Sequence, residues 1–330
     1  MPRAVLIGGT GMIGRAAARA LAADGWEVVA VSRSGTLPEG LAELGIESVV
    51  ADRNDDAQLR AALGSGADVV LDTVAFNRKN GEQLNALEGL VGSLVVISSG
   101  SVYADDDGRS LDGEGGEFPR FPVPIPETQP IAEPGDATYS TQKAELEQTL
   151  LEGPLPATLI RPCAIHGPGA ELPRELHFVK RAVDGRRRVA LAWNGESRFH
   201  TTSVANLAEL IRLAAAQPGN RPLNSGDPDP PTTLEICHAI GWALDHEFEP
   251  ALLPGEAFGN PWAVPLPVVV SMEAAECELG YRPAATYPEA VKETCAWIVG
   301  ELEAGRSWDG TYLAEGLDYA AEDEALASRT

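Results

Sequence analysis

The first half of the chain alternates short apolar runs with helical stretches, and this alternation constrains the fold more than any other feature. Six runs have the composition of buried strands, at residues 4–7, 27–32, 48–51, 68–72, 94–98 and 157–160. Helical patterns lie between them, as at residues 13–24, 56–63 and 81–91. Strand, helix and strand in regular succession form a parallel sheet covered by helices on both faces. The sequence therefore predicts an α/β fold with a doubly wound parallel sheet, whose ligands bind at the carboxyl ends of the strands.

A glycine-rich loop follows the first predicted strand. Glycines at positions 8, 11 and 14 allow a tight turn, close approach of the backbone to a pyrophosphate, and close packing of helix on sheet. The free N–H groups at the start of the next helix attract phosphate. Because the loop stands between a strand and a helix, it predicts a Rossmann-like dinucleotide site. The residues expected to bind are Gly8, Thr10, Gly11, Met12, Ile13 and Gly14.

The end of the second predicted strand bears on which dinucleotide is bound. NAD sites place a carboxylate there to hold the ribose 2′-hydroxyl, but this chain has Ser32, Arg33 and Ser34. An arginine at this point pairs with a 2′-phosphate, and a serine hydroxyl adds a hydrogen bond. We therefore expect Ser32 and Arg33 to bind NADP, with NAD as the other candidate. The alternative interpretation of Arg33 is an ordinary exposed surface side chain.

Tyr139 and Lys143 stand four residues apart in a helical stretch at residues 137–152, which places them on one helix face. A nearby ammonium stabilises a phenolate and lowers the pKa of the tyrosine toward working pH. Such a tyrosine exchanges a proton with a substrate hydroxyl or carbonyl, and the lysine also holds ribose hydroxyls. A serine from residues 98–101, after the fifth predicted strand, would stabilise the charge that develops on the reacting oxygen. Turn formation is the alternative role for that serine.

With these residues assembled, the chain resembles the extended short-chain dehydrogenase/reductases, the NAD-dependent epimerase/dehydratase family. The resemblance covers nearly the whole length and is carried by residues 8–14, 51–53, 98–103, 139–143 and 161–168. It implies that the catalytic serine is Ser99, beside Tyr139 and Lys143. It further implies that Asp52 and Arg53 flank the adenine and that Ala75, Pro162 and Ile165 line the rest of the cofactor. Ser101, His166 and Arg198 are the substrate-binding residues that it implies.

Several departures from the family pattern indicate a divergent branch. Gly100 and Ser101 stand where the sugar-nucleotide dehydratases of the family carry an Asp-Glu pair, so dehydration is disfavoured. His166 replaces the usual tyrosine and is expected to reshape the substrate pocket. Residues 72–76 also depart from the family pattern and indicate no substrate. The arginine-rich residues 186–188, with Arg174, would either meet a substrate phosphate or be solvated.

The expected domain organisation follows the family. Residues 1–165 and 198–225 form the dinucleotide-binding domain, and residues 166–197 and 226–300 form a smaller C-terminal substrate domain. Residues 104–135, rich in proline and acid, are an irregular insertion that acts either as a surface loop or as a lid. Residues 301–330 are an acidic C-terminal tail, either frayed or docked on a neighbour.

Composition restricts the partners. With 25 basic and 49 acidic residues, the net charge is −24, which disfavours nucleic acid and anionic membranes. The four cysteines form no CxxC pair, the five histidines form no HExxH or HxxxH motif, and no metal site is expected. No run approaches the roughly 20 apolar residues of a membrane span. We expect a cytoplasmic protein that binds a small molecule, and the family resemblance implies a homodimer as one possible assembly.

Three functions fit these observations. The first is an NADP(H)-dependent oxidoreductase acting on a carbonyl or secondary alcohol of a small molecule. The second is a redox-neutral sugar-nucleotide epimerase with the same three side chains and tightly held cofactor. The third is a non-catalytic nucleotide-sensing or RNA-binding relative, which the presence of Ser99, Tyr139 and Lys143 disfavours. Arg33 favours the first, since a phosphate-selective site suits an exchangeable NADPH.

Overall fold

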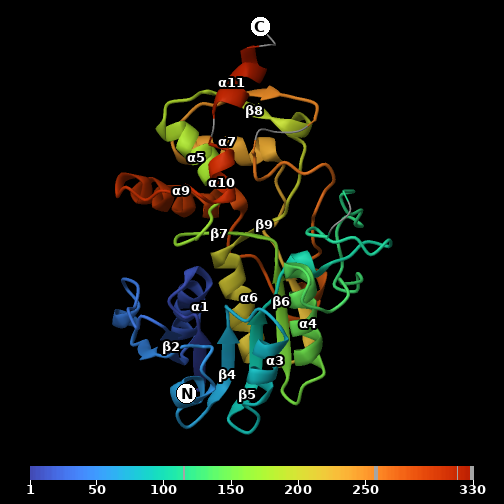
Figure 1. The fold of residues 1–330 in the computed structure, drawn as a ribbon. Coiled ribbons are helices and arrows are strands. Elements are labelled where there is room, and N and C mark those ends of the chain that lie inside the picture. Colours follow the sequence, from blue (N-terminus) through green and yellow to red (C-terminus); the bar gives the residue numbers. More distant parts are fainter. Residues whose placement is uncertain (114–115, 256–258, 318, 328–330) are drawn as a thin grey trace. The chain divides into compact units, whose positions relative to one another are not determined.

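The computed structural model describes residues 1–113, 116–255, 259–317 and 319–327. Its backbone contacts divide the chain into two compact units, which are described separately (Figure 1). The first unit contains residues 1–163, 204–225 and 270–282, and the second contains residues 164–203, 226–269 and 283–330.

The first unit is built on a seven-stranded, fully parallel sheet, which confirms the predicted α/β class and doubly wound sheet. Its strand order is β10-β6-β5-β4-β1-β2-β3. The strands are β1 (Arg3–Ile7), β2 (Glu27–Ser32), β3 (Glu47–Val50), β4 (Ala67–Asp72), β5 (Val91–Ile97), β6 (Ala157–Pro162) and β10 (Arg221–Ser225). β2 and β3 are added on one side of β1, whereas β4, β5, β6 and β10 are added on the other. The loops after β1, β4 and β5 therefore meet at the carboxyl edge of the sheet, where the strand order switches sides.

Helices cover both faces of this sheet. They are α1 (Met12–Ala23), α2 (Asp56–Leu63), α3 (Arg78–Asn85), α4 (Tyr139–Leu151), α6 (Val204–Ala216) and α8 (Glu273–Leu279). On one face, α2, α3 and α4 enclose a core of Val, Leu and Ile side chains from the strands, and on the other α1 packs beside α6 (Figure 1). Two 3₁₀ turns, η1 (Ala42–Leu44) and η2 (Gly100–Val102), complete the unit.

Side-chain caps fix where the helices of the first unit begin. Asp55 accepts hydrogen bonds from the first turn of α2, Asn77 caps α3, and Thr138 forms a capping box with Thr141 at the start of α4. The Asn77 cap explains one difference from the sequence expectation. The helix expected at residues 81–91 begins and ends earlier, and the chain then turns at Gly89 (φ +80°) to enter β5.

The second unit has a core of its own, with two pairs of short parallel strands. Its elements are β7 (Ala164–His166), α5 (Leu176–Val183), β8 (Arg188–Leu191), η3 (Ala192–Gly195), β9 (Thr201–Ser203), α7 (Thr233–Ala243), β11 (Glu249–Leu252), α9 (Tyr287–Glu303), α10 (Tyr312–Glu315) and α11 (Tyr319–Ala327). β7 pairs with β9 and β8 with β11. The buried core draws on α5, α7 and α9, and includes Phe178, Ile240 and Ile298.

The unit boundaries differ from the expected domains at four places, each for a visible reason. Residues 164–165 and 198–203 lie in the second unit because β7 pairs with β9. Residues 270–282 lie in the first because Val270 forms a bridge with Ile125. The described part of residues 301–330 belongs to the second unit: Glu322 is buried, accepts from Arg181 (3.0 Å) and from the Ala190 N–H (2.9 Å), and so docks α11.

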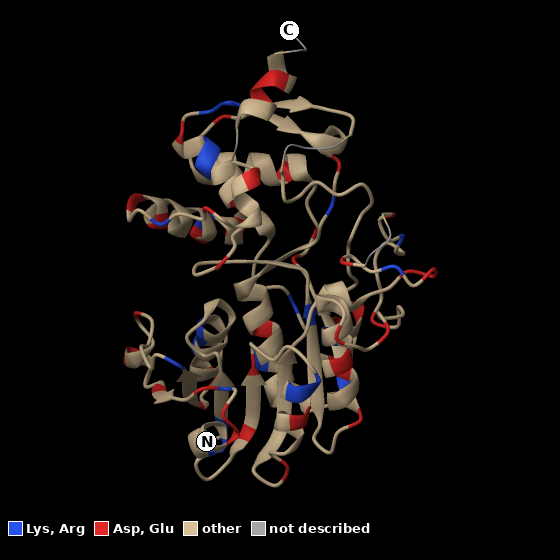
Figure 2. Cartoon of the chain, viewed as in Figure 1, with Lys and Arg blue, Asp and Glu red and all other residues tan. Residues whose placement is uncertain are grey.

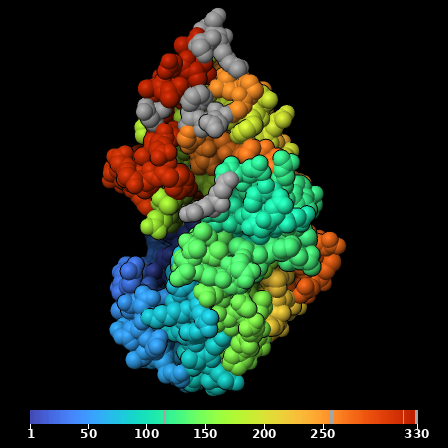
Figure 3. Space-filling model, turned by 45° about the vertical axis from the view of Figure 1, so that its right-hand side comes forward, coloured from blue at the N-terminus to red at the C-terminus, as the bar shows by residue number. Residues whose placement is uncertain are grey.

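The described part of the insertion, residues 104–113 and 116–135, contains neither helix nor strand, as expected. Asp105 organises its first part, because the carboxylate accepts hydrogen bonds from Arg109 and from the Arg120 N–H. The insertion lies at the surface beside α4 (Figure 3), and the Gly135 N–H donates to the Thr141 carbonyl (3.1 Å).

Acidic residues are spread through both units rather than confined to the insertion and the C-terminal residues (Figure 2). The basic residues 186 and 187 are paired inside the second unit: Arg186 contacts Asp323, and Arg187 contacts Glu247 (2.8 Å) and Glu249 (3.0 Å). Within the described residues, no helix is both long and apolar enough to span a membrane.

Candidate active site

The glycine loop packs so tightly that side chains are excluded at three positions. Gly8 has φ +78°, and a Cβ there would lie 2.3 Å from Oγ1 of Thr73. A Cβ on Gly14 would lie 2.2 Å from the Gly8 carbonyl oxygen. Gly9, which the sequence analysis did not single out, is equally constrained, because its Cβ would meet Ala30 of β2 at 2.8 Å. These glycines therefore set the turn from β1 into α1.

The start of α1 fits a phosphate group. Its N-cap is Gly11, which provides no side-chain cap, and the first turn carries no acid. The N–H groups of Met12, Ile13 and Gly14 therefore lack a capping side chain and point toward the carboxyl edge of the sheet. Thr10 precedes the cap and is half-buried. This cradle is what the pyrophosphate of a dinucleotide requires.

The residues after β2 include an exposed, positively charged side chain, that of Arg33. Oγ of Ser32 accepts a hydrogen bond from the Gly35 N–H (3.0 Å). Arg33 is exposed, and among the described residues its side chain has no hydrogen-bond or ion-pair partner. The guanidinium is therefore available to an external anion.

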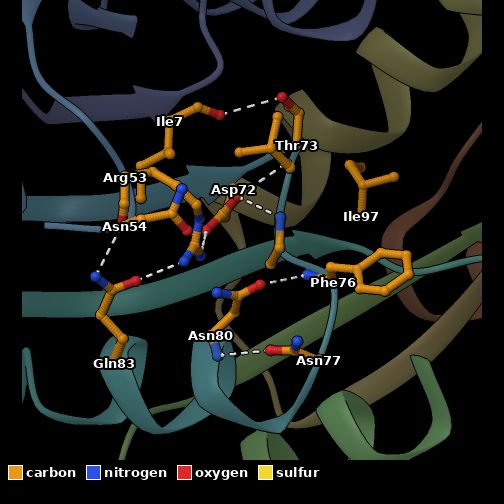
Figure 4. A network of polar contacts seen from close by, with 12 residues as sticks. Ile7, Arg53, Asn54, Asp72, Thr73, Phe76, Asn77, Asn80, Gln83 and Ile97 are labelled. Atoms are coloured by element: carbon orange, nitrogen blue, oxygen red, sulfur yellow. Dashed lines mark hydrogen bonds and ion pairs between the residues drawn. The ribbon is translucent and has the colours of Figure 1, made fainter. Parts of the chain in front are cut away.

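Arg53, which the resemblance expects beside an adenine, has partners within the protein. Its guanidinium is one-tenth exposed and donates to Asp72 and to Oε1 of Gln83 (2.5 Å) (Figure 4). Asp52 accepts from the Asn54 N–H (2.9 Å), and its own N–H donates to Gln58 (2.9 Å). Asp52 thus shapes the loop after β3, while the side chain of Arg53 points into the protein.

Asp72 is a residue of this site that the sequence analysis did not assign. It ends β4 and is fully buried, and its Oδ1 accepts from the N–H groups of Val74 (2.9 Å) and Ala75 (2.8 Å). The next residues are also held: Thr73 donates to the Ile7 carbonyl (3.1 Å), and the Phe76 N–H donates to Asn80 (2.8 Å) (Figure 4). The available signal was a carboxylate directly after the apolar run at residues 69–71.

Lys143 reaches from α4 to the ends of β4 and β5. Its Nζ donates to the carbonyl oxygens of Ala75 (2.7 Å) and Ile97 (3.0 Å), and the side chain is buried. Burial lowers the pKa of Lys143 to about 8, an effect that Asp72 and Glu147 oppose and Arg53 reinforces. The predicted lysine is therefore fixed at the carboxyl edge of the sheet, with a pKa below that of a solvated lysine.

Tyr139 is the first residue of α4, and its side chain is 42% exposed. Its ring lies 5.5 Å from the Phe76 ring and 5.8 Å from Nζ of Lys143. Burial raises the pKa of Tyr139, a hydrogen bond with Ser99 lowers it, and the charge of Asp112 raises it further. The net direction is opposite to the one expected from the Tyr-x-x-x-Lys spacing, because desolvation is the largest effect.

Ser99 caps the 3₁₀ turn η2, where its Oγ accepts from the Ser101 N–H (3.1 Å). Ser101 is half-buried in the same turn. Tyr103 is completely buried, with its hydroxyl donating to Asn224 (2.6 Å) and accepting from Arg161 (3.1 Å). The structure therefore brings Ser99, and not Tyr103, to Tyr139.

Pro162 ends β6 and is buried. Gly100 packs closely beside the Pro162 carbonyl, because a Cβ on Gly100 would lie 3.4 Å from that oxygen. This places the β6 terminus against the turn that carries Ser99. Ser99, Tyr139, Lys143 and Ala75 thus gather in the first unit, with the glycine loop reaching the same group through Thr73 and Val74.

The other expected site residues, Ile165, His166 and Arg198, belong to the second unit. Ile165 is half-buried in β7. His166 is buried, with Nε2 hydrogen-bonded to Asp227 (2.9 Å) and Nδ1 to Thr294 (3.2 Å). Arg198 donates to the Pro230 carbonyl (2.5 Å). Arg174 lies over the Phe199 ring, 4.6 Å from its centroid.

The geometry of the first unit suits proton transfer to or from an oxygen atom. A partly exposed phenol stands beside a serine hydroxyl, and a buried amine lies behind its ring. The phenol can give a proton to a carbonyl oxygen, the serine can hold that oxygen, and the amine can stabilise the charge that develops.

Two curated relatives are similar to this chain. The 2′-dehydrokanamycin reductase of Streptomyces kanamyceticus is 28% identical, with 95% of this chain and 89% of the relative covered. The 4-hydroxy-2-methyl-3-oxo-4-farnesyl-3,4-dihydroquinoline-1-oxide ketoreductase of Stigmatella aurantiaca is 26% identical. That match spans 64% of this chain and 64% of the ketoreductase.

Solved structures share the fold. UDP-glucose 4-epimerase from Bifidobacterium longum, in complex with NAD⁺ and UDP, has a TM-score of 0.68 and 18% identity. The similarity covers 91% of this chain and 99% of that one. The model of the NAD dependent epimerase/dehydratase family matches residues 4–226, which contain the glycine loop and all three residues Ser99, Tyr139 and Lys143. This chain belongs to the NAD dependent epimerase/dehydratase family, whose members are enzymes.

Proposed function

We propose that this protein is an NADP(H)-dependent oxidoreductase that interconverts a ketone and a secondary alcohol on a small molecule. The observation that carries the proposal is the grouping of Ser99, Tyr139 and Lys143 beside the glycine loop. The two curated relatives, whose names describe a reductase and a ketoreductase, support the same reaction class.

The cofactor would be held mainly by the backbone. The loop of Gly8, Gly11 and Gly14, with the start of α1, would receive the pyrophosphate, and Ser32 and Arg33 would contact a 2′-phosphate. Asp52 would lie at the adenine, and Ala75, Pro162 and Ile165 at the nicotinamide end. When bound, the dinucleotide would supply or accept the hydride.

The chain's own residues would manage the proton. Tyr139 would donate its phenolic proton to the substrate oxygen in the reductive direction. In the oxidative direction its phenolate would accept the hydroxyl proton of the alcohol. Ser99 would hold that oxygen through its hydroxyl. The Lys143 ammonium would stabilise the negative charge left on the phenol. Ser101, His166 and Arg198 remain the proposed substrate-site residues.

A sugar-nucleotide epimerase is the second candidate, because it would use the same three side chains without net redox change. The two reactions are separated by incubating the purified protein with NADPH and a panel of ketones and nucleotide sugars. Stoichiometric NADPH consumption with a ketone is the expected result. Sugar interconversion without NADPH consumption would identify an epimerase, and cofactor binding with neither reaction would identify a non-catalytic relative.

We also propose a cytoplasmic location and a homodimer. Buried Cys237 and Cys295 are free thiols, which supports a reducing compartment. Sedimentation equilibrium of the purified protein tests the dimer, and a mass of one chain would contradict it.

A further inference from the structure

One residue, Ala75, links the buried acid Asp72 to the amine of Lys143. The N–H of Ala75 donates to Oδ1 of Asp72 (2.8 Å), and the carbonyl of Ala75 accepts from Nζ of Lys143 (2.7 Å). Because Asp72 also accepts from the Val74 N–H (2.9 Å), a single carboxylate fixes two successive backbone groups. The carbonyl that receives the ammonium therefore takes its position from Asp72.

The second oxygen of Asp72 is held by Arg53. The Arg53 guanidinium contacts Oδ2 of Asp72 and Oε1 of Gln83, and Nε2 of Gln83 donates back to the Arg53 carbonyl (2.8 Å) (Figure 4). Asp72 is fully buried and the Arg53 side chain nearly so. A buried carboxylate with partners on both oxygens has one orientation, since any rotation would leave a charge unpaired.

Three charged groups act on the ammonium of Lys143. Asp72 faces it from the end of β4, Arg53 from the loop before α2, and Glu147 from α4 itself. Glu147 is already held by Arg161, through contacts of 3.0 and 2.6 Å. The pKa effects agree with this arrangement, since Asp72 raises the pKa of Lys143 more than Glu147 does.

We propose that Asp72, oriented by Arg53, is the positioning residue of Lys143. It holds the Ala75 carbonyl against the amine and keeps a negative charge near it, so that the amine is protonated when Tyr139 reacts. The inference rests on the proposed function for the role of Lys143 in the reaction, whereas the contacts themselves belong to the fold. It also gives Arg53 a role different from binding adenine.

A carboxylate that only braced the loop would leave the protonation of Lys143 unchanged if its charge were removed. Asp72→Asn separates these roles. The amide oxygen of the variant still accepts from the Val74 and Ala75 N–H groups, but its negative charge is gone. The informative measurement is therefore the proton equilibrium of Lys143, followed beside the activity.

Lysine titration by NMR reads this equilibrium directly. The only lysines are Lys79, Lys143, Lys180 and Lys292, so nitrogen-15 labelling gives few signals, and Lys143→Met assigns the relevant one. We expect Asp72→Asn to lower the Lys143 midpoint by about one pH unit, because an opposite charge is lost. Arg53→Gln should raise the midpoint, because a like charge is lost, and Arg53→Lys should restore it.

Glu82→Gln is the matched control. It removes a carboxylate from an exposed ion pair with Arg78 on α3 and should leave the Lys143 midpoint unchanged. An Asp72→Asn midpoint equal to that of the wild type would overturn the proposal, as would a shift in the same direction for Asp72→Asn and Arg53→Gln. If Asp72→Asn fails to fold, the two variants Arg53→Gln and Arg53→Lys test the proposal instead. A rise in Arg53→Gln that Arg53→Lys reverses supports the proposal, and an unmoved midpoint overturns it.

The titration requires no turnover, which separates this inference from the proposed function. If no ketone is reduced but the lysine midpoint responds to Asp72→Asn, the function is wrong and the positioning role stands. If Lys143→Met abolishes ketone reduction while the midpoint ignores Asp72→Asn, the function stands and the positioning role is wrong.

Discussion

The carboxylate of Asp112 accepts a hydrogen bond from the backbone N–H of Ser140 at 2.9 Å. This contact joins the acidic insertion to the first turn of α4, immediately after Tyr139. A negative charge at a helix N-terminus is stabilising, because it meets the unpaired N–H groups and the positive end of the helix dipole. The same charge disfavours a phenolate on Tyr139. The insertion therefore acts on the chemistry of α4 as well as covering its surface.

Replacing Asp112 by Asn should lower the pKa of Tyr139, because the phenolate no longer faces a negative charge. In the oxidative direction the rate rises as the phenol loses its proton, so the midpoint of that rise should move to lower pH. The pH dependence of alcohol oxidation measures it. Asp107→Asn is the control, since Asp107 is exposed and pairs with Arg109 in the same insertion. Coincident midpoints for the wild type and Asp112→Asn would contradict the prediction.

Tyr139→Phe should reduce turnover by about 10²–10⁴-fold, because the proton donor is lost. NADPH affinity should remain, since the phenyl ring still packs beside Phe76. Fluorescence titration of NADPH and steady-state kinetics separate the two effects. Tyr312→Phe, at an exposed tyrosine of α10, should keep full activity. A fully active Tyr139→Phe protein would refute the catalytic assignment.

The parts of the site that the sequence predicted are local in sequence. The glycine loop is a contiguous segment, and Tyr139 and Lys143 share a helix face at a spacing of four residues. The strands followed from the repeated apolar runs, because each run is one contiguous segment of the chain. Patterns within short segments were therefore enough to predict most strands and helices of the first unit.

The parts that the sequence did not predict depend on contacts between distant residues. Arg53 follows β3 and Asp72 ends β4, two strands that β1 and β2 separate in the sheet order, and nothing in either segment indicates this pairing. Glu322 pairs with Arg181 across 141 positions, so the acidic tail gave no sign of its docking. The direction of the Tyr139 pKa shift also depends on burial, which spacing alone does not supply.

Arg33→Ala should raise the Kd for NADP by about 10–100-fold, because a charge-assisted contact with the 2′-phosphate is lost. The Kd for NAD should stay unchanged, since NAD lacks that phosphate. Isothermal titration with each dinucleotide measures both. The control is Arg78→Ala, which removes an exposed arginine from a different element, α3. Equal losses for NADP and NAD, or tighter NAD binding by the wild type, would contradict NADP preference.

Gly14→Ala should destabilise the protein by about 1–3 kcal/mol or more, because its Cβ would lie 2.2 Å from the Gly8 carbonyl oxygen. Dinucleotide binding should be lost with the geometry of the loop. Gly300→Ala is a matched control in the interior of α9, where a Cβ meets nothing within 4 Å. It should stabilise the helix by about 0.5–1 kcal/mol. Chemical denaturation and NADPH titration of both variants test the pair, and normal binding by Gly14→Ala would contradict it.

His166 should make the stability of the protein depend on pH. Burial of the ring alone would lower its pKa, but the hydrogen bond and charge of Asp227 outweigh burial, so the pKa of His166 is raised. A raised pKa contributes stability that is fully present below the unfolded value of about 6.5 and is lost as pH rises through the folded value. His166→Gln should therefore lower the free energy of unfolding most near pH 6, by on the order of 3 kcal/mol, and by less at higher pH. Denaturation curves across this range measure the difference, with exposed His238→Gln as control. A cost for His166→Gln that is constant with pH would show that the ring is neutral in the folded protein.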